Sequence, residues 1–162
     1  MTKTPKQAIR DFWQSYLATL PEDTSRNENL PECWAFGSGA DMADELGGLA
    51  ARGTKTATCS LLYEYEAEGS ELPKPGDLSI ILDGCGFPLC LIETTEVTIK
   101  PFNKVDVQFA YDEGEGDRTY TYWREGHMRF FTRTCEELGC SFSENMQVVC
   151  ERFRLVHKPS GA

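Results

Sequence analysis

The sequence lacks an apolar run that could span a bilayer. Its longest apolar stretches, such as Leu89–Ile92, are far shorter than the about 20 residues that a transmembrane helix needs. The first residues, MTKTPKQAIRDFW, include basic side chains but neither a continuous apolar core nor a small-residue cleavage site. This is not the pattern of a secretion signal. We therefore expect a cytoplasmic protein that does not associate with a membrane.

Basic residues are also scarce, since 16 lysines and arginines face 26 aspartates and glutamates, for a formal net charge of −10. A field of this sign repels phosphate groups. The composition therefore predicts no broad DNA binding. A small basic cleft on such an acidic body would suit a single nucleoside or a short single-stranded RNA.

Histidine is rare, with two residues, and the cysteine count of seven is odd. Cys85 with Cys90, and Cys135 with Cys140, leave four residues between them, which is the wide end of the spacing that zinc tolerates. Without an export signal, the cysteines are expected to be reduced and packed as small apolar groups. We predict no metal and no cofactor, with structural zinc as the less favoured alternative.

The length of 162 residues and the average share of apolar residues predict one domain over residues 1–162. Apolar side chains recur at helical spacing and stop at Pro21, which predicts a helix over residues 5–20 packed on the rest of the fold. Further helices are predicted over 40–52, 102–111 and 120–138, and strands over 57–63, 78–82, 88–99 and 146–157. Because strands and helices alternate without a βαβ repeat, we predict an α+β fold with a small mixed β-barrel flanked by helices.

One candidate for chemistry is the run Gly53-Thr54-Lys55-Thr56-Ala57-Thr58, at the junction of a predicted helix and strand. A threonine hydroxyl is a weak nucleophile until a base takes its proton. Lys55 could be that base only if burial lowers its pKa toward neutrality. Without other support, the same pattern describes an exposed lysine beside ordinary strand threonines.

An acidic run follows at residues 112–117, with four carboxylates and two glycines. Any of these carboxylates could orient the lysine or relay a proton, and the glycines allow one of them to turn inward. A solvated, flexible loop is the alternative. The run lacks the D-x-D-x-D-G pattern of an EF-hand calcium loop.

Several side chains elsewhere could contact a ligand. Trp34, Phe36 and Gly37 could form a shelf on which a base stacks, although core packing explains them equally well. Glu93 and Glu96 are three residues apart on a predicted strand and point to opposite faces. If one is buried, it needs a cationic partner such as Lys55 or Arg124. We predict that the substrate contacts Trp34, Phe36, Gly37, Thr56, Glu93 and Arg124.

These motifs resemble the ASCH-domain family, in its longer bacterial branch. The resemblance is carried by Trp34-Ala35-Phe36-Gly37, the G-x-K-x-x-T run at Gly53–Thr58, Pro75-Gly76-Asp77, Leu91–Val97, Phe109-Ala110, Glu113–Asp117, Trp123 and Phe130-Phe131. It extends in order from about Trp13 to Arg154. The resemblance implies a PUA-like fold and a nucleoside or RNA ligand.

A shorter member of this family removes the acetyl group of N4-acetylcytidine with a lysine, a threonine and a glutamate. The resemblance places these roles on Lys55, Thr58 and Glu113, with Lys55 taking the proton of Thr58. A related long member has been described as a ribonuclease, so a metal-independent ribonuclease is one alternative. The other is a non-catalytic RNA-binding module, in which Lys55 and Arg124 contact phosphate and aromatic residues such as Tyr111 stack on bases.

Overall fold

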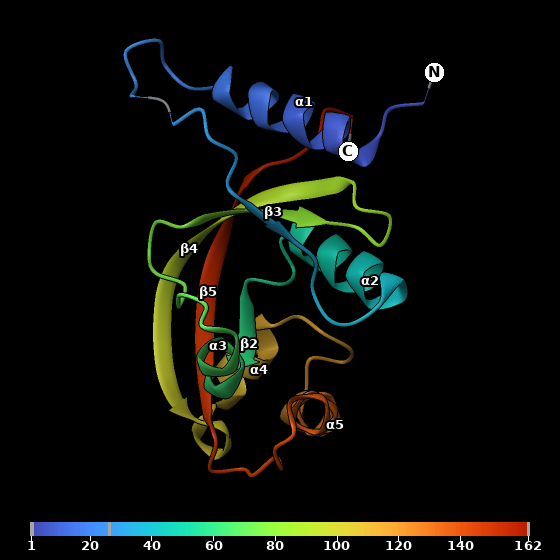
Figure 1. The fold of residues 1–162 in the computed structure, drawn as a ribbon, viewed down its shortest axis with the longest axis vertical. Helices are drawn as coiled ribbons and strands as arrows, with labels where there is room; N and C mark the ends of the chain where they lie inside the picture. The colour runs from blue at the N-terminus through green and yellow to red at the C-terminus, as the bar shows by residue number, and fades with distance from the viewer. Residues whose placement is uncertain (1, 26, 162) are drawn as a thin grey trace. The chain divides into compact units, whose positions relative to one another are not determined.

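Two long strands, β4 (Pro88–Pro101) and β5 (Gln147–His157), pass through both of the units into which the chain divides (Figure 1). The structure is a computed structural model that describes residues 2–25 and 27–161. One unit comprises the chain up to Gly53, Leu78–Glu93 and the chain from Leu155 on. The other comprises Thr54–Asp77 and Thr94–Arg154. The prediction of one domain over the whole chain stays a prediction.

The first unit combines two helices with the edge of the sheet. Its further elements are α1 (Pro5–Leu17), β1 (Glu32–Trp34), α2 (Ala40–Ala51) and β3 (Leu78–Leu82). Strand β3 pairs in parallel with β1 and antiparallel with β4. Helix α1 begins after Thr4, whose hydroxyl accepts the amide of Gln7, and its buried face packs on Ile80 and Leu91. It ends at Leu17, three residues before the predicted end.

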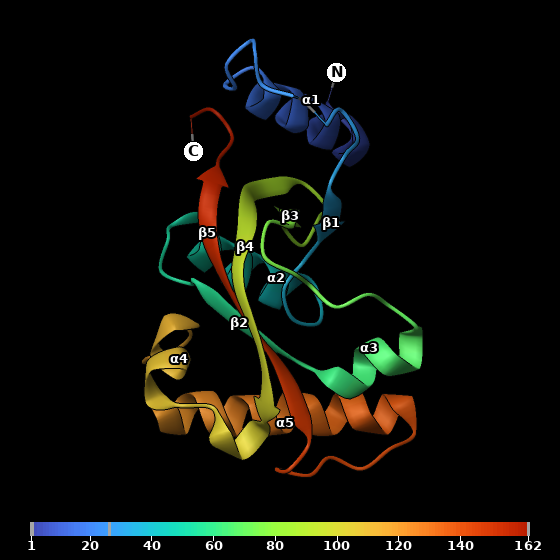
Figure 2. The same ribbon diagram turned by 90° about the vertical axis from the view of Figure 1, so that its left-hand side faces the viewer.

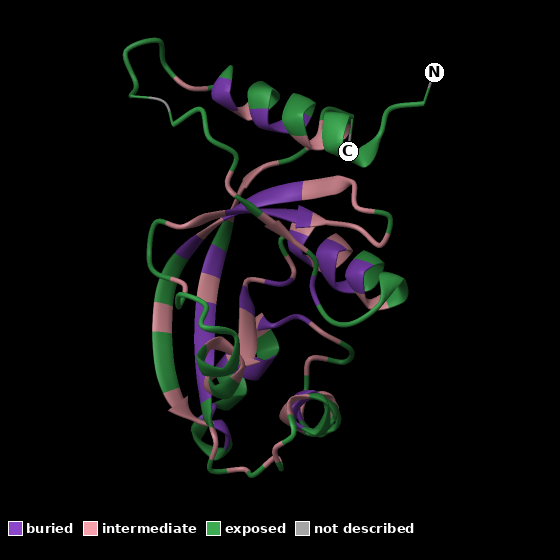
Figure 3. Ribbon diagram, viewed as in Figure 1, coloured by how far each residue is buried: buried purple, intermediate pink, exposed green. Residues whose placement is uncertain are grey.

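The second unit holds the remaining elements, β2 (Ala57–Leu61), α3 (Leu62–Glu68), the 3₁₀ turn η1 (Phe102–Lys104), α4 (Val107–Asp112) and α5 (Tyr120–Leu138). Strand β2 pairs antiparallel with β5. Helix α4 lies beside α5 (Figure 2). The buried aromatic side chains of the two helices pack with residues of β2 and β5. Figure 3 shows along the ribbon which residues are buried. The aromatic part of this core comprises Phe102, Phe109, Trp123 and Phe131. The unit therefore has its own core.

The hydrogen-bonded strand order β1-β3-β4-β5-β2 is a mixed sheet, as predicted. Strand β3 and helix α5 have the predicted bounds. The predicted strand over 57–63 is wrong in its last two residues, because the chain turns into α3 at Leu62 and the Tyr65 hydroxyl meets Ser60 Oγ at 3.1 Å. The predicted helix over 102–111 is interrupted, because Asp106 caps a new helix by accepting the amide of Phe109.

Two further expectations concern membrane-spanning helices and the state of the cysteines. Among the described residues, no helix is both long and apolar enough to cross a membrane. The seven cysteines, all of which lie in the described part, are unpaired thiols.

Candidate active site

The acidic loop, residues 113–117, contacts the segment just before β2 at a point where only glycine fits. Gly114 has a φ of +73°, and a Cβ there would lie 2.6 Å from the Thr54 carbonyl oxygen. One residue pair secures the contact, since the amide and the hydroxyl of Thr56 donate to the Asp112 carbonyl at 2.8 and 3.3 Å. The loop thereby places Glu113 against Lys55. The Thr56 hydroxyl, predicted to bind substrate, is used in this contact.

The Lys55 ammonium lies between two carboxylates. Its Nζ is 3.1 Å from Glu113 Oε1, 3.1 Å from Glu115 Oε2 and 3.4 Å from the Glu113 carbonyl oxygen. Since an ammonium has three N–H donors, these three acceptors match its donor number. The side chains of Lys55 and Glu113 are 1% exposed and that of Glu115 is 18% exposed. Lys55 is therefore a buried ion-pair residue and does not point into bulk solvent.

Helix α5 completes the cluster from the other side of Glu113. Glu113 Oε2 accepts the indole N–H of Trp123 and lies 3.0 Å from Nε2 of His127. The other ring nitrogen of His127, Nδ1, lies 2.8 Å from the Trp123 carbonyl oxygen. Because both ring nitrogens face acceptors, the network assigns a proton to each of them and hence a positive charge to the ring. Trp123 and His127 are four residues apart and so share one face of the helix.

The charges of the cluster control one another's pKa values. Burial alone would lower the pKa of Lys55, but the charges of Glu113 and Glu115 outweigh it and raise that pKa. Burial alone would raise the pKa of Glu113, but the charges of His127 and Lys55, together with the hydrogen bonds from His127 and Trp123, lower it to about 2. The pKa of His127 is raised, because Glu113 outweighs the effect of burial. At neutral pH the Lys55 side chain is an ammonium, so the condition for a lysine base is not met.

Three side chains of the cluster could in principle ligate a metal ion. The ligand atoms of Glu113, Glu115 and His127 lie within 4.8 Å of one another. However, Lys55 already places a cation 3.1 Å from both carboxylates, and a doubly protonated imidazole has no lone pair for a metal. The residues therefore do not fit a metal ion in this protonation state.

Thr58 lies on β2 outside this network. Ala57, Cys59 and Leu61 face the core that α4 and α5 cover, and the charges of Glu113 and Lys55 act on the pKa of the Cys59 thiol, which burial raises. Thr58 points to the opposite face of the strand, because neighbouring strand residues alternate. Within residues 2–25 and 27–161 its hydroxyl makes no side-chain hydrogen bond to Lys55 or Glu113. The structure brings Lys55 and Glu113 together and places Thr58 beside Glu151, its partner on β5.

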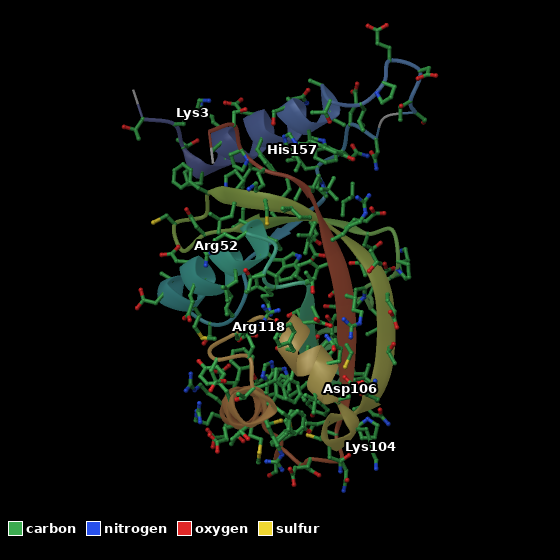
Figure 4. The ribbon with its side chains drawn as sticks, turned by 180° about the vertical axis from the view of Figure 1, so that it is seen from behind. Lys3, Arg52, Lys104, Asp106, Arg118 and His157 are labelled. Atoms are coloured by element: carbon green, nitrogen blue, oxygen red, sulfur yellow. The ribbon has the colours of Figure 1, made fainter. Side chains whose placement is uncertain are left out.

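Arg118, labelled in Figure 4, follows the acidic loop and contacts its neighbour Tyr111. It is a non-glycine residue with a φ of +62°. Its Nε donates to the Tyr111 carbonyl at 2.9 Å, and its guanidinium lies 3.6 Å from the centre of the Tyr111 ring. This cation–π contact uses the ring that the RNA-binding alternative needs for base stacking. The Arg118 guanidinium therefore occupies one face of the Tyr111 ring.

The other predicted substrate contacts are divided between the two units. Trp34, Phe36, Gly37 and Glu93 belong to the first unit. There Phe36 is 3% exposed, and its ring meets Trp34 edge to face at 4.8 Å between ring centres. Arg124 lies in the second unit, where its guanidinium pairs with Glu144 and contacts Met128 Sδ at 2.9 Å. These contacts give Arg124 a structural partner, and its role toward a substrate stays a prediction.

The sequence interpretation missed His127 and gave Glu115 no specific role. A signal for His127 was present, since it follows Trp123 by one helical turn on a predicted helix. A histidine beside a tryptophan on the face that meets an acidic loop is a reasonable partner for one of its carboxylates. The sequence did not indicate which carboxylate of residues 112–117 turns inward.

Comparison with known proteins gives a family. The family model described as "ASCH domain" matches residues 32–157. A crystal structure of an ASCH domain from Lactobacillus crispatus JV V101 is similar at 35% identity and a TM-score of 0.85, covering 93% of this chain and 94% of that one. Protein EF3133 from Enterococcus faecalis V583 is similar at 39% identity and a TM-score of 0.83, covering 93% and 89%. No curated protein matches. The predicted fold class, a PUA-like small mixed β-barrel flanked by helices, is confirmed.

Proposed function

The chain belongs to the ASCH-domain family, and we propose that it hydrolyses the amide of an acylated nucleoside, with N4-acetylcytidine as the first candidate. The products would be cytidine and acetate. The proposed nucleophile is the Thr58 hydroxyl, which follows Lys55 closely in the chain, and the buried Lys55–Glu113 pair supplies the charged groups. Neither a metal nor a cofactor takes part in this proposal.

The observation that carries the proposal is the buried Lys55–Glu113 ion pair at the family motif. Both side chains are 1% exposed, and lysine and glutamate are almost never buried so fully without a partner. Removing two charges from water costs several kcal/mol per ion, which their attraction only partly offsets. Groups with strongly perturbed pKa values are concentrated at functional sites. Lys55 of this pair belongs to the G-x-K-x-x-T run, and this position in the family motif supports an active site.

The raised pKa of Lys55 changes the role expected from the sequence. A residue that stays protonated cannot take the proton of Thr58, so we assign to Lys55 the stabilisation of negative charge that develops on the substrate. Glu113 accepts from Trp123 and from two charged groups, Lys55 and His127, and is assigned the relay of a proton toward the leaving amine. His127 holds Glu113 from the helix side, as the orienting partner in this relay.

The proposed partner is a small nucleoside, and short single-stranded RNA is the second candidate. The net charge of −10 disfavours long nucleic acids, because their phosphates are repelled. In addition, the Arg118 guanidinium covers one face of the Tyr111 ring, which is therefore less available for base stacking. A neutral acylated nucleoside meets neither obstacle.

The test is to incubate the purified protein with a panel of acylated nucleosides and, separately, with single-stranded RNA, and to separate the products. The proposal expects cytidine and acetate from N4-acetylcytidine, in amounts proportional to enzyme, and intact RNA. Cleaved RNA without nucleoside hydrolysis would support the ribonuclease alternative. Binding of RNA without any product, weakened by Lys55→Met, would support the binding module.

A further inference from the structure

On the function proposed above, we infer that Glu151 is the general base that takes the proton of Thr58. Glu151 lies on β5 in the second unit, directly opposite Thr58 of β2 in the antiparallel pair. It is a buried ionisable residue whose carboxylate accepts the hydroxyl of Thr94. The inference names the missing proton acceptor of the proposed reaction.

The register of β2 and β5 puts the two side chains on the same face of the sheet. Residues directly opposite each other in an antiparallel pair have Cβ atoms about 4.5–5.5 Å apart. Thr58 pairs with Glu151, and the next pair along the ladder is Cys59 with Cys150. The Cys59–Cys150 pair belongs to the core under α4 and α5. Thr58 and Glu151 therefore share the other face as direct neighbours across the strand pair.

The surroundings of Glu151 keep its carboxylate in a defined position. Glu151 is 7% exposed, and its Oε1 accepts the hydroxyl of Thr94 at 2.5 Å. A hydroxyl-to-oxygen distance this short is typical of a hydrogen bond to an ionised carboxylate. Thr94 is itself 2% exposed and lies on β4, the neighbouring strand. The contact therefore orients the carboxylate from the side away from β2.

The other acids and bases near the motif are unsuited to this step. Lys55 donates all its protons to carboxylate and carbonyl oxygens and stays charged. Glu113 already accepts from Lys55 on one oxygen and from Trp123 on the other. Glu151 is the carboxylate that the strand register itself places beside the threonine.

The reaction that follows is balanced with water as the only co-reactant. Glu151 accepts the Thr58 proton as Oγ1 attacks the acyl carbonyl carbon, and the C–N bond of the amide then breaks. The leaving amine takes up the proton that Glu151 accepted, so that Glu151 is again a carboxylate and an ester on Thr58 remains. Water attacks this ester with Glu151 as base, which releases the carboxylic acid and restores the hydroxyl.

The first arm of the test measures turnover of N4-acetylcytidine. Glu151→Gln should lose about a hundredfold or more in kcat, because a general base contributes on that order. Combining it with Thr58→Ala should cost little more than the worse single variant. The matched control is Glu96→Gln, which removes a carboxylate of β4 that is 63% exposed. Wild-type turnover in Glu151→Gln would overturn the inference.

The second arm does not need a substrate. In Thr58→Cys, a nearby carboxylate raises the pKa of the introduced thiol, so adding Glu151→Gln should lower it. The rate of alkylation by iodoacetamide as a function of pH, read at the peptide level by mass spectrometry, measures this pKa. Equal thiol pKa values in the two proteins would show that Glu151 does not face position 58 and would overturn the inference.

The two arms separate the inference from the proposed function. If the wild-type protein hydrolyses no acylated nucleoside but the thiol pKa depends on Glu151, the substrate assignment is wrong and the pairing of the two residues stands. Should Glu151→Gln fail to fold, Glu151→Asp takes its place in the turnover assay. Shortening the side chain while keeping its charge should cost about tenfold or more in kcat with the fold retained. Unchanged turnover in that variant would overturn the inference.

Discussion

Replacing Glu113 by glutamine should destabilise the protein by an amount that depends on pH in a defined way. The pKa of Glu113 falls from 4.5 to about 2 on folding, because His127 and Lys55 outweigh the effect of burial. This difference corresponds to about 3 kcal/mol of the free energy of unfolding at neutral pH. The side chain is 1% exposed, so solvent screening does not reduce the value. Glutamine resembles the protonated acid, and Glu113→Gln should lose this contribution.

The sign follows from the lowered pKa. A carboxylate whose folded pKa lies below its unfolded value stabilises the protein above the unfolded pKa, and the contribution is lost as pH falls through the folded one. The difference between wild type and Glu113→Gln should therefore be about 3 kcal/mol at pH 7 and should shrink between about pH 4.5 and 2. At neutral pH the midpoint of thermal unfolding should fall by about 6–12 °C.

Urea unfolding at a series of pH values measures the difference directly. The other carboxylates titrate in both proteins, so their contribution cancels in the comparison. Glu125→Gln, a change at an exposed position of α5, is the control and should leave the stability unchanged within about 0.5 kcal/mol. A difference between wild type and Glu113→Gln that is below about 1 kcal/mol, or that does not change with pH, would refute the proposed charge network.

Three further predictions concern the same cluster and its surroundings. Lys55→Met should cost about 3–5 kcal/mol, because it removes the cation that lies between Glu113 and Glu115 and leaves His127 as the one charged partner of Glu113 described above. Lys55→Arg should cost less. Chemical denaturation measures both costs, and equal costs would contradict the role of the charge. Because folding raises the pKa of His127, the charged ring stabilises the protein fully below pH 6.5, and this contribution is lost as pH rises through the folded pKa. The free energies of unfolding of wild type and His127→Asn should therefore converge at high pH. A difference between them that does not change with pH would argue against an imidazolium. Thiol titration of the protein unfolded under anaerobic conditions should find seven free cysteines, and stoichiometric zinc would contradict the expectation of a metal-free protein.

Sequence reasoning succeeded where a periodic pattern extends over many residues. Helix α5 was predicted with its observed bounds, because apolar side chains recur at helical spacing for five turns. It was less reliable at the end of β2, since a short apolar run has no period that distinguishes strand from helix. The switch to α3 at Leu62 depends instead on tertiary contacts such as that between Tyr65 and Ser60.

The candidate site was predictable in part. The resemblance to the family named Lys55 and Glu113, and the structure places them in contact. The sign of the Lys55 pKa shift could not be read from the sequence, because it depends on two carboxylates 58 and 60 residues further along the chain. The pairing of Thr58 with Glu151 likewise requires the register between two strands that lie far apart in the sequence.

The central claim is that Thr58 is the nucleophile of an amidohydrolase, and the most direct measurement is the turnover of N4-acetylcytidine by wild type and Thr58→Ala. Wild type should release cytidine and acetate. Thr58→Ala should stay folded and lose about a hundredfold or more in kcat. Ligand binding should survive in the variant, because the substitution removes one methyl and one hydroxyl group without changing a charge. Hydrolysis by Thr58→Ala at the wild-type rate, or no hydrolysis by wild type at all, would contradict the central claim.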